Sequence, residues 1–196
     1  MSILKPALDN LKTWFVEWVN SIDVSSIKPY LHLHKKSKYF TFNYTETLEN
    51  VYKIPFDNIC HIHGSRLSHD NQYIFGHNNL KNDNGKYSEL PLFEENAYLS
   101  ILEYFNEFMK PIKEKIGLNK LFFENLSDIK LVYVLGHSMS VIDMDYFKEI
   151  FFQFKQQPRF IFSTYNKKDK NKVADFVANN NIRQYKIIDI TDLKSN

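Results

Sequence analysis

Glycine is scarce in this chain of 196 residues: there are 5, whereas average usage of about 7% would give roughly 14. The glycine-rich phosphate-binding strings GxGxxG, GxxxxGKS and GxxxxGKT do not occur in the sequence. The chain therefore either does not cradle phosphates in this way, or the segment that does so is not part of this sequence.

Cysteine and long apolar runs are lacking as well. The single cysteine, Cys60, excludes an internal disulfide and is typical of a reducing compartment. The first residues do not combine a cationic region with an apolar one, and no run of 18 apolar residues occurs. These features predict a cytoplasmic protein with no membrane partner.

Arginine is rare, and charge of one sign is not in excess. Lysine plus arginine total 25 and aspartate plus glutamate total 23, which gives a net charge of +2. The arginines are Arg66, Arg159 and Arg183. A reader of DNA grooves usually presents several bidentate arginines on a concentrated basic face. Nucleic acid is therefore an unfavoured partner.

What is present is typical of one folded domain. Hydrophobic residues make up 43%, charged residues 24% and aromatic residues 16% of the chain. This length and composition suit a single α/β domain. We expect one domain over 1–196, with a helical region at 1–37 and a core at 38–190.

Hydrophobic periodicity predicts alternating helices and strands. Apolar residues at helical spacing predict helices over 4–22, over about 98–116 with a break at Pro111, after Asp143, and over 167–178. Short β-rich runs predict strands at 39–42, 59–64, 72–76, 131–136, 160–163 and 185–188, and 78–90 is a polar loop. The strand–helix alternation after 131 predicts a mostly parallel sheet with helices on both faces.

Polar residues and glycines follow several of these strands directly. They are Asn43, His63 with Gly64, and the run Gly136-His137-Ser138. In parallel α/β sheets, ligands bind at the carboxyl ends of the strands. The sequence thus predicts that these residues meet at one candidate site.

Each of these residues also has a plain structural interpretation. Asn43 with Glu46 three residues later has the form of a helix capping box, and His63 suits a buried histidine bonded to the backbone. The functional alternatives are an asparagine that orients water or an amide and a histidine that acts as a general base.

Two other kinds of site are weak interpretations of the sequence. Gly136-His137-Ser138-Met139-Ser140 lacks the second glycine of the G-x-S-x-G nucleophile elbow, and no histidine follows Ser138, as that fold's triad order requires. His61-x-His63, with Cys60, His69 and His77 nearby, lacks a recognised metal spacing. We therefore expect neither a serine nucleophile nor a metal ion.

Several motifs taken together resemble the bacteriophage abortive infection AbiH family, over about residues 38–190. The motifs are Phe42-Asn43-Tyr44-Thr45-x-Thr47-Leu48-Glu49, Ile62-His63-Gly64, Phe75-Gly76-His77, Gly136-His137-Ser138-Met139 followed by Asp143 and Tyr146-Phe147, and Ser163-Thr164-Tyr165-Asn166. The spaced Gly136-to-Phe147 block is the most specific of them.

That family in turn resembles sirtuin-like antiviral proteins, which implies a Rossmann-like fold and hydrolysis of NAD. By this resemblance, His63 is the base acting on the ribose and Asn43 positions water or nicotinamide. Gly64, Gly136, His137, Ser138 and Asp143 would line the dinucleotide side of the cleft.

The resemblance also implies a missing part. Family members begin with a strand and a Gly-Asn-Gly-Phe-Asp type of turn, which this sequence does not contain. The chain is then expected to be an N-terminally truncated relative: a fragment, one half of a split gene whose missing segment is on an upstream polypeptide, or a degenerate copy. An uncovered sheet edge would also favour a homo-oligomer. The alternative is a non-catalytic defence module that recognises a phage component or completes a partner subunit.

Overall fold

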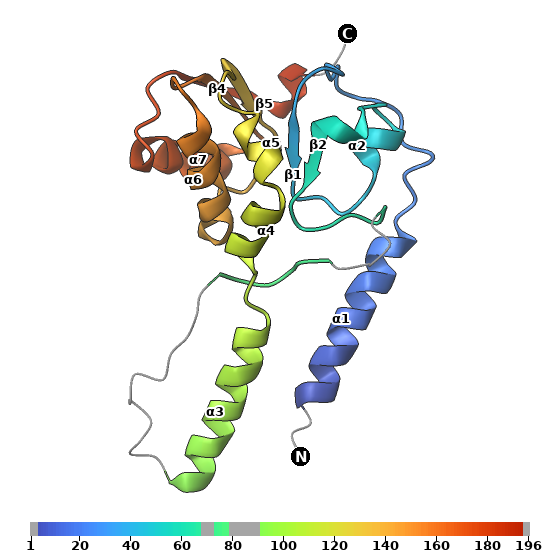
Figure 1. The fold of residues 1–196 in the computed structure, drawn as a ribbon, viewed down its shortest axis with the longest axis vertical. Helices are drawn as coiled ribbons and strands as arrows, with labels where there is room; N and C mark the ends of the chain where they lie inside the picture. Colours follow the sequence, from blue (N-terminus) through green and yellow to red (C-terminus); the bar gives the residue numbers. More distant parts are fainter. Residues whose placement is uncertain (1–3, 68–72, 79–90, 194–196) are drawn as a thin grey trace.

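The computed structural model describes residues 4–67, 73–78 and 91–193 as helices, strands and connecting segments (Figure 1). The α-helices are α1 (Leu4–Ser21), α2 (Thr47–Asn50), α3 (Leu92–Glu107), α4 (Ile112–Leu118), α5 (Lys120–Glu124), α6 (Met144–Gln153) and α7 (Lys167–Asn179). The strands are β1 (Tyr39–Thr41), β2 (Ile59–His61), β3 (Leu131–Val134), β4 (Arg159–Thr164) and β5 (Tyr185–Asp189). Short 3-10 turns are η1 (Phe56–Asn58), η2 (Val141–Asp143) and η3 (Ile190–Leu193).

The strands form two small parallel sheets. β1 pairs with β2, with Thr41 opposite His61. The second sheet has the order β3-β4-β5, and both of its pairs are parallel. The predicted α/β class and parallel pairing are confirmed, but the sheet is divided because β1 and β3 do not pair with each other.

The three-stranded sheet buries one face against α6 and α7. Phe160 and Phe162 of β4 are 2% and 0% exposed and pack with Phe147 of α6 and Phe176 of α7. Side chains alternate between the two faces of a strand. On the opposite face, Leu131 and Tyr133 of β3 are 44% and 50% exposed. Leu131 and Tyr133 therefore leave part of that face open.

Helix α6 connects the two sheets through its side chains. Tyr146 and Ile150 belong to the apolar cluster that includes Cys60 and Ile62 of the β2 region. Phe147 belongs to the cluster under β4. The two sheets are thus held together by burial against one helix.

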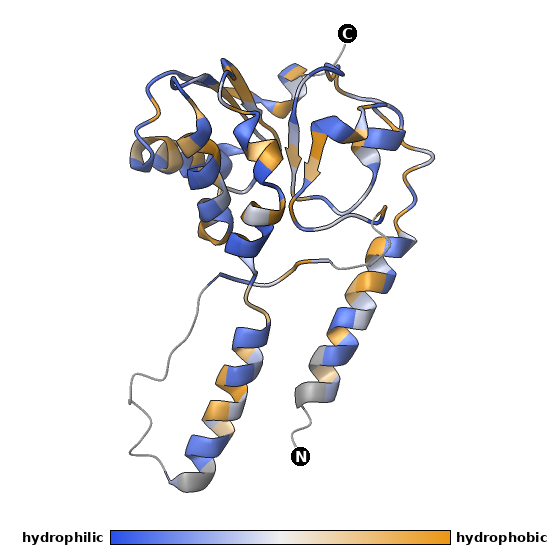
Figure 2. Cartoon of the chain, viewed as in Figure 1, coloured by the Kyte–Doolittle hydropathy of each residue, from blue (hydrophilic) through white to orange (hydrophobic). Residues whose placement is uncertain are grey.

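Helices α1 and α3 extend away from the strands, and Figure 2 shows polar and apolar residues interspersed along both. Lys12 links them, with its Nζ 3.9 Å from Glu107 Oε2 and 5.0 Å from the Phe108 ring centroid. Arg66 anchors the end of α1 by donating to the carbonyl oxygens of Val19, Asn20 and Ile22. Of the helices in the described ranges, none is long and apolar enough to cross a membrane.

Three expectations about local structure need correction or limits. The capping box predicted for Asn43 and Glu46 is wrong, since α2 begins at Thr47 and has no side-chain cap. The Glu46 carboxylate pairs with Arg66 instead. The expected strand at 72–76 is absent over its described residues, 73–76, where only the neighbouring His77 forms an isolated bridge, with Met109. The expected break at Pro111 is confirmed, since α4 follows that residue. The polar loop lies outside the described residues from 79 onward.

Candidate functional site

The strand ends do bring part of the predicted site together. Phe42 directly follows β1, and its ring centroid lies 4.6 Å from that of His137 and 5.1 Å from that of His63. His63 follows β2, and His137 follows β3. The carboxyl ends of the two sheets therefore meet around the Phe42 ring.

The polar centre of the site is formed by His63, Lys110 and Asp143. Lys110 Nζ donates to Asp143 Oδ1 at 2.9 Å and to His63 Nε2 at 3.3 Å. His63 Nε2 lies 3.6 Å from the same Asp143 oxygen. His63 and Lys110 are 4% and 9% exposed. A buried ammonium, carboxylate and imidazole thus share one small volume.

His63 is held in its neutral form. Burial and the adjacent Lys110 ammonium lower the pKa of His63 to about 4, although Asp143 opposes this shift. Because an ammonium can only donate, His63 Nε2 accepts and its proton resides on Nδ1. A neutral imidazole is the form that a general base requires.

Asp143 is held as a carboxylate and lies between two donors. Burial alone would raise its pKa, but the adjacent His137 side chain and the hydrogen bond from Lys110 outweigh burial and lower the pKa to about 2. His137 Nδ1 accepts from the Met139 N–H at 3.0 Å, so its proton lies on Nε2, 3.6 Å from Asp143 Oδ2. Asp143 is therefore the negative centre of the site.

Aromatic rings enclose His63. The ring centroids of Tyr146, Phe42 and Tyr44 lie 5.7, 5.1 and 6.3 Å from that of His63. Burial, with a contribution from Asp143, raises the pKa of Tyr44 to about 12, and its hydroxyl donates to the Ile74 carbonyl at 2.7 Å. The Tyr146 hydroxyl is buried without a hydrogen-bond partner among the described residues. A buried hydroxyl of this kind is a ready donor for a ligand oxygen.

Gly76 explains how Lys110 reaches the site. His77 N donates to the Phe108 carbonyl at 3.1 Å, and Lys110 N donates to the His77 carbonyl at 2.7 Å. Gly76 has a φ of +129°, and a Cβ at this position would lie 2.0 Å from the Phe108 oxygen. Only glycine allows this approach, which fixes the segment that carries Lys110.

The remaining predicted residues lie around this cluster and do not join its hydrogen bonds. Asn43 and Ser138 are exposed, and Gly64 and Gly136 have positive φ at the strand ends. The side chain of Ser138 makes no hydrogen bond to a histidine within the described ranges. The Asn43 backbone is fixed, since its carbonyl accepts from His61 Nδ1 at 2.8 Å.

His61 and His63 do not act as a pair. β2 ends at His61, whose Nε2 lies 2.8 Å from Glu49 Oε1, whereas His63 faces Lys110 and Asp143. Within the described part of the chain, no group of three or more His, Cys, Asp or Glu side chains is arranged to hold a metal ion.

Lys110 is the residue of the site that sequence reasoning missed. It stands alone before Pro111, and no local pattern separates it from the other lysines. Tyr44 and Tyr146 occur within the motifs, but the motifs predict no role for them. The sequence feature that bears on Lys110 is the Phe75-Gly76-His77 motif, because the His77 carbonyl accepts a hydrogen bond from Lys110 N.

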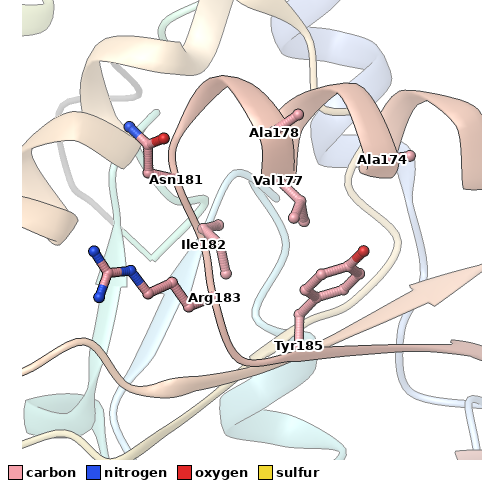
Figure 3. A pocket seen from close by; sticks show the side chains of 7 residues that line it. All are labelled: Ala174, Val177, Ala178, Asn181, Ile182, Arg183 and Tyr185. Atoms are coloured by element: carbon pink, nitrogen blue, oxygen red, sulfur yellow. The ribbon is translucent and has the colours of Figure 1, made fainter.

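Two cavities lie away from this cluster. The larger, about 530 Å³, is lined by residues of α7 and the segment leading into β5, including Val177, Arg183 and Tyr185 (Figure 3). The smaller, about 170 Å³, lies between Phe151, Phe160 and Asn180. Neither includes a residue of the candidate site.

The low pKa of His63 predicts that acid destabilises the fold. The native chain protonates His63 only near pH 4, whereas the unfolded chain does so near 6.5. Between these values the unfolded state binds more protons, so stability falls as pH falls. We expect this group to remove on the order of 2 kcal/mol of unfolding free energy between pH 7 and pH 5.

Urea denaturation at both pH values tests this contribution. His63→Gln should show a smaller loss on acidification than the wild type, and His32→Gln, which removes an exposed histidine, is the control. Equal losses in His63→Gln and wild type would contradict the assignment.

Parallel strands with a polar cluster at their carboxyl ends define an α/β protein with a candidate ligand site. Residues 2–165 match the family described as Bacteriophage abortive infection AbiH. This chain belongs to that family, which supports a role in abortive infection. No curated protein and no solved structure matches the chain.

Proposed function

We propose that this chain acts in phage defence as part of an NAD-consuming hydrolase, with His63 as its base. The observation that carries the proposal is the neutral, buried His63 held between Lys110 and Asp143 at the strand ends. The family match to residues 2–165 supports the defence role, and the resemblance to sirtuin-like proteins suggests the substrate.

In the proposed reaction, the bond between ribose C1′ and the nicotinamide nitrogen breaks, and its electron pair leaves with nicotinamide. Water adds to C1′, and His63 takes up the proton that is released. Asp143 stabilises the imidazolium that forms, and the Tyr146 hydroxyl is available to a ribose oxygen. Asn43, exposed at the rim, orients water or the amide.

The remaining predicted residues are proposed to line the dinucleotide side. They are Gly64, Gly136, His137 and Ser138, which follow β2 and β3. Lys110 must move from His63 Nε2 before that nitrogen can accept a substrate proton, because its ammonium now occupies the lone pair. Substrate entry is therefore expected to open the Lys110 contact.

The expected result is release of nicotinamide from NAD by the purified chain, measured by chromatography. His63→Ala should lower the rate by about 100-fold or more, the usual contribution of a general base. His32→Ala, an exposed histidine, should retain the wild-type rate. Wild-type protein that releases no nicotinamide, even with the polypeptide encoded directly upstream added, would contradict the proposal.

The second candidate is a non-catalytic defence module that binds a phage component or completes a partner subunit. The closed state of His63, which is 4% exposed with its Nε2 bound by Lys110, favours this alternative. In that case His63→Ala would leave phage protection intact in a plaque assay while the folded protein persists.

A further inference from the structure

His61 faces hydrogen-bond acceptors with both of its ring nitrogens. Nδ1 lies 2.8 Å from the Asn43 carbonyl oxygen, and Nε2 lies 2.8 Å from Glu49 Oε1. A carbonyl oxygen only accepts, so Nδ1 carries a proton. A second proton must lie between Nε2 and Glu49 Oε1, because two lone pairs at this distance form no hydrogen bond. His61 and Glu49 together thus hold one proton more than a neutral imidazole and a carboxylate would.

The additional proton belongs on His61. An imidazole nitrogen is a stronger base than a carboxylate oxygen, so the pair is an imidazolium and a carboxylate. The side chains of His61 and Glu49 are 7% and 11% exposed, so water competes little with this bond. Glu49 Oε2 is buried without a hydrogen-bond partner among the described residues, which leaves His61 to balance the carboxylate charge.

A second carboxylate, that of Glu46, also lies within reach of the His61 charge. The pKa of Glu46 is lowered chiefly by its hydrogen bond with Arg66, and the positive charge of His61 adds to this shift. Glu46 directly precedes α2 and Glu49 lies within it, and Figure 1 shows α2 beside β2. Two carboxylates of the α2 region therefore favour a cationic His61 at the end of β2.

The Nδ1 side of His61 holds the turn that follows β1. Asn43 N donates to Thr41 Oγ1 at 3.1 Å, and the Asn43 carbonyl accepts from His61. The next carbonyl, that of Tyr44, accepts from Arg66 N at 2.8 Å. A hydrogen bond from a charged donor is about twice as strong as one from a neutral donor. Successive backbone groups of this turn are therefore bonded, and His61 supplies the charged donor among these bonds.

This turn carries two residues of the candidate site. The Phe42 ring centroid lies 5.1 Å from that of His63, and Asn43 is exposed at the rim. We propose that His61 is a charged positioning residue, which Glu49 holds as an imidazolium and which fixes the turn through the Asn43 carbonyl. It thereby sets where the Phe42 ring and the Asn43 side chain lie. The charge and the placement stand without NAD hydrolysis, whereas an effect on nicotinamide release rests on the proposed function.

Nitrogen-15 spectra of the histidine rings in the full chain at pH 7 test the charge. Both ring nitrogens of His61 should give the signals of protonated nitrogens. His63 is the internal reference, since it should show a protonated Nδ1 and a bare Nε2 in the same spectrum. His61→Asn, which removes the ring, assigns the His61 signals. A bare Nε2 in His61 would overturn the proposal, because the additional proton would then belong to Glu49.

Glu49→Gln separates the charge of the pair from its hydrogen bond. The glutamine amide can donate to Nε2, so the ring no longer needs a second proton. In this variant His61 Nε2 should become bare, while Nδ1 stays protonated and the ring signals of Phe42 stay in place. Glu103→Gln, which changes an exposed glutamate of α3, is the control and should leave both nitrogens protonated. A protonated Nε2 in Glu49→Gln would contradict the role given to Glu49.

His61→Asn and His61→Leu test the placement. Both variants remove the bond to Glu49, but the asparagine amide lies where Nδ1 lay and can donate to the Asn43 carbonyl, whereas leucine cannot. The ring signals of Phe42 and His63 should stay near their wild-type positions in His61→Asn and shift in His61→Leu. Equal shifts in the two variants would contradict the positioning role.

Nicotinamide release separates this role from the proposed function. His61→Leu should lower the rate by about 100-fold, the scale of a misplaced group near the reacting atoms, and His61→Asn should keep most of the rate. Equal losses in the two variants would again contradict the positioning role. Wild-type protein without activity would contradict the proposed function, and the ring signals would still decide the placement. If His61→Leu does not fold, the wild-type and Glu49→Gln spectra still uphold or overturn the charged pair.

Discussion

Gly76→Ala is expected to lower the free energy of unfolding by about 3 kcal/mol or more, from backbone strain and overpacking combined. The new Cβ would lie 2.0 Å from the Phe108 oxygen, and the φ of +129° is one that alanine rarely adopts. The Phe108 atom is backbone, so it cannot rotate away. Urea denaturation followed by far-UV circular dichroism measures the loss.

The same chain offers a matched control for this glycine. Gly117 lies within α4, and a Cβ there would meet nothing within 4 Å. Gly117→Ala should stabilise the chain by about 0.5–1 kcal/mol, because alanine loses less freedom than glycine in a helix. Similar stability changes in the two variants would contradict the role given to Gly76.

Asp143→Ala should cost about 3–5 kcal/mol of unfolding free energy, because it leaves the Lys110 ammonium buried without its carboxylate. Lys110 Nζ lies 2.9 Å from Asp143 Oδ1, and both side chains are largely buried. The double variant Lys110→Met with Asp143→Leu removes both charges and should recover most of the loss. Chemical denaturation of Asp143→Ala at pH 7 measures the loss, and Lys110→Met, Asp143→Leu and their double variant give the coupling between the two charges.

Asp145 provides the control for this pair. It lies two residues away and contacts Lys148 at 2.7 Å, but both side chains are exposed. Asp145→Ala should change stability by about 1 kcal/mol or less, the usual range for surface ion pairs. A double variant that is no more stable than Asp143→Ala would show that shape, and not charge, determines the loss.

Local patterns predicted most helices and strands, because the spacing of apolar residues that defines a helix or a strand is contained within a short stretch of sequence. The run at 131–134 and the helix after Asp143 are examples. The capping box failed because Glu46 has a distant partner, Arg66, which no local pattern identifies. The expected strand at 72–76 failed because Ile74 N bonds to the His63 carbonyl and His77 to Phe108, which are not neighbouring strands.

The candidate site could be predicted only where strands end. His63 and His137 come together because their strands are parallel and are supported by the same helix. Lys110 arrives from a segment between helices, and its position depends on the backbone bonds to His77. Such a contact joins residues far apart in sequence, so spacing alone does not reveal it.

The placement of tryptophan has a practical consequence. The chain has two tryptophans, Trp14 and Trp18, and both lie on α1 with 61% and 57% of their surface exposed. Intrinsic tryptophan emission therefore reports on this extended helix and is nearly blind to the core around Tyr146. A change in emission would register release of the Arg66 anchor, or a partner that covers α1, while the sheets remain intact.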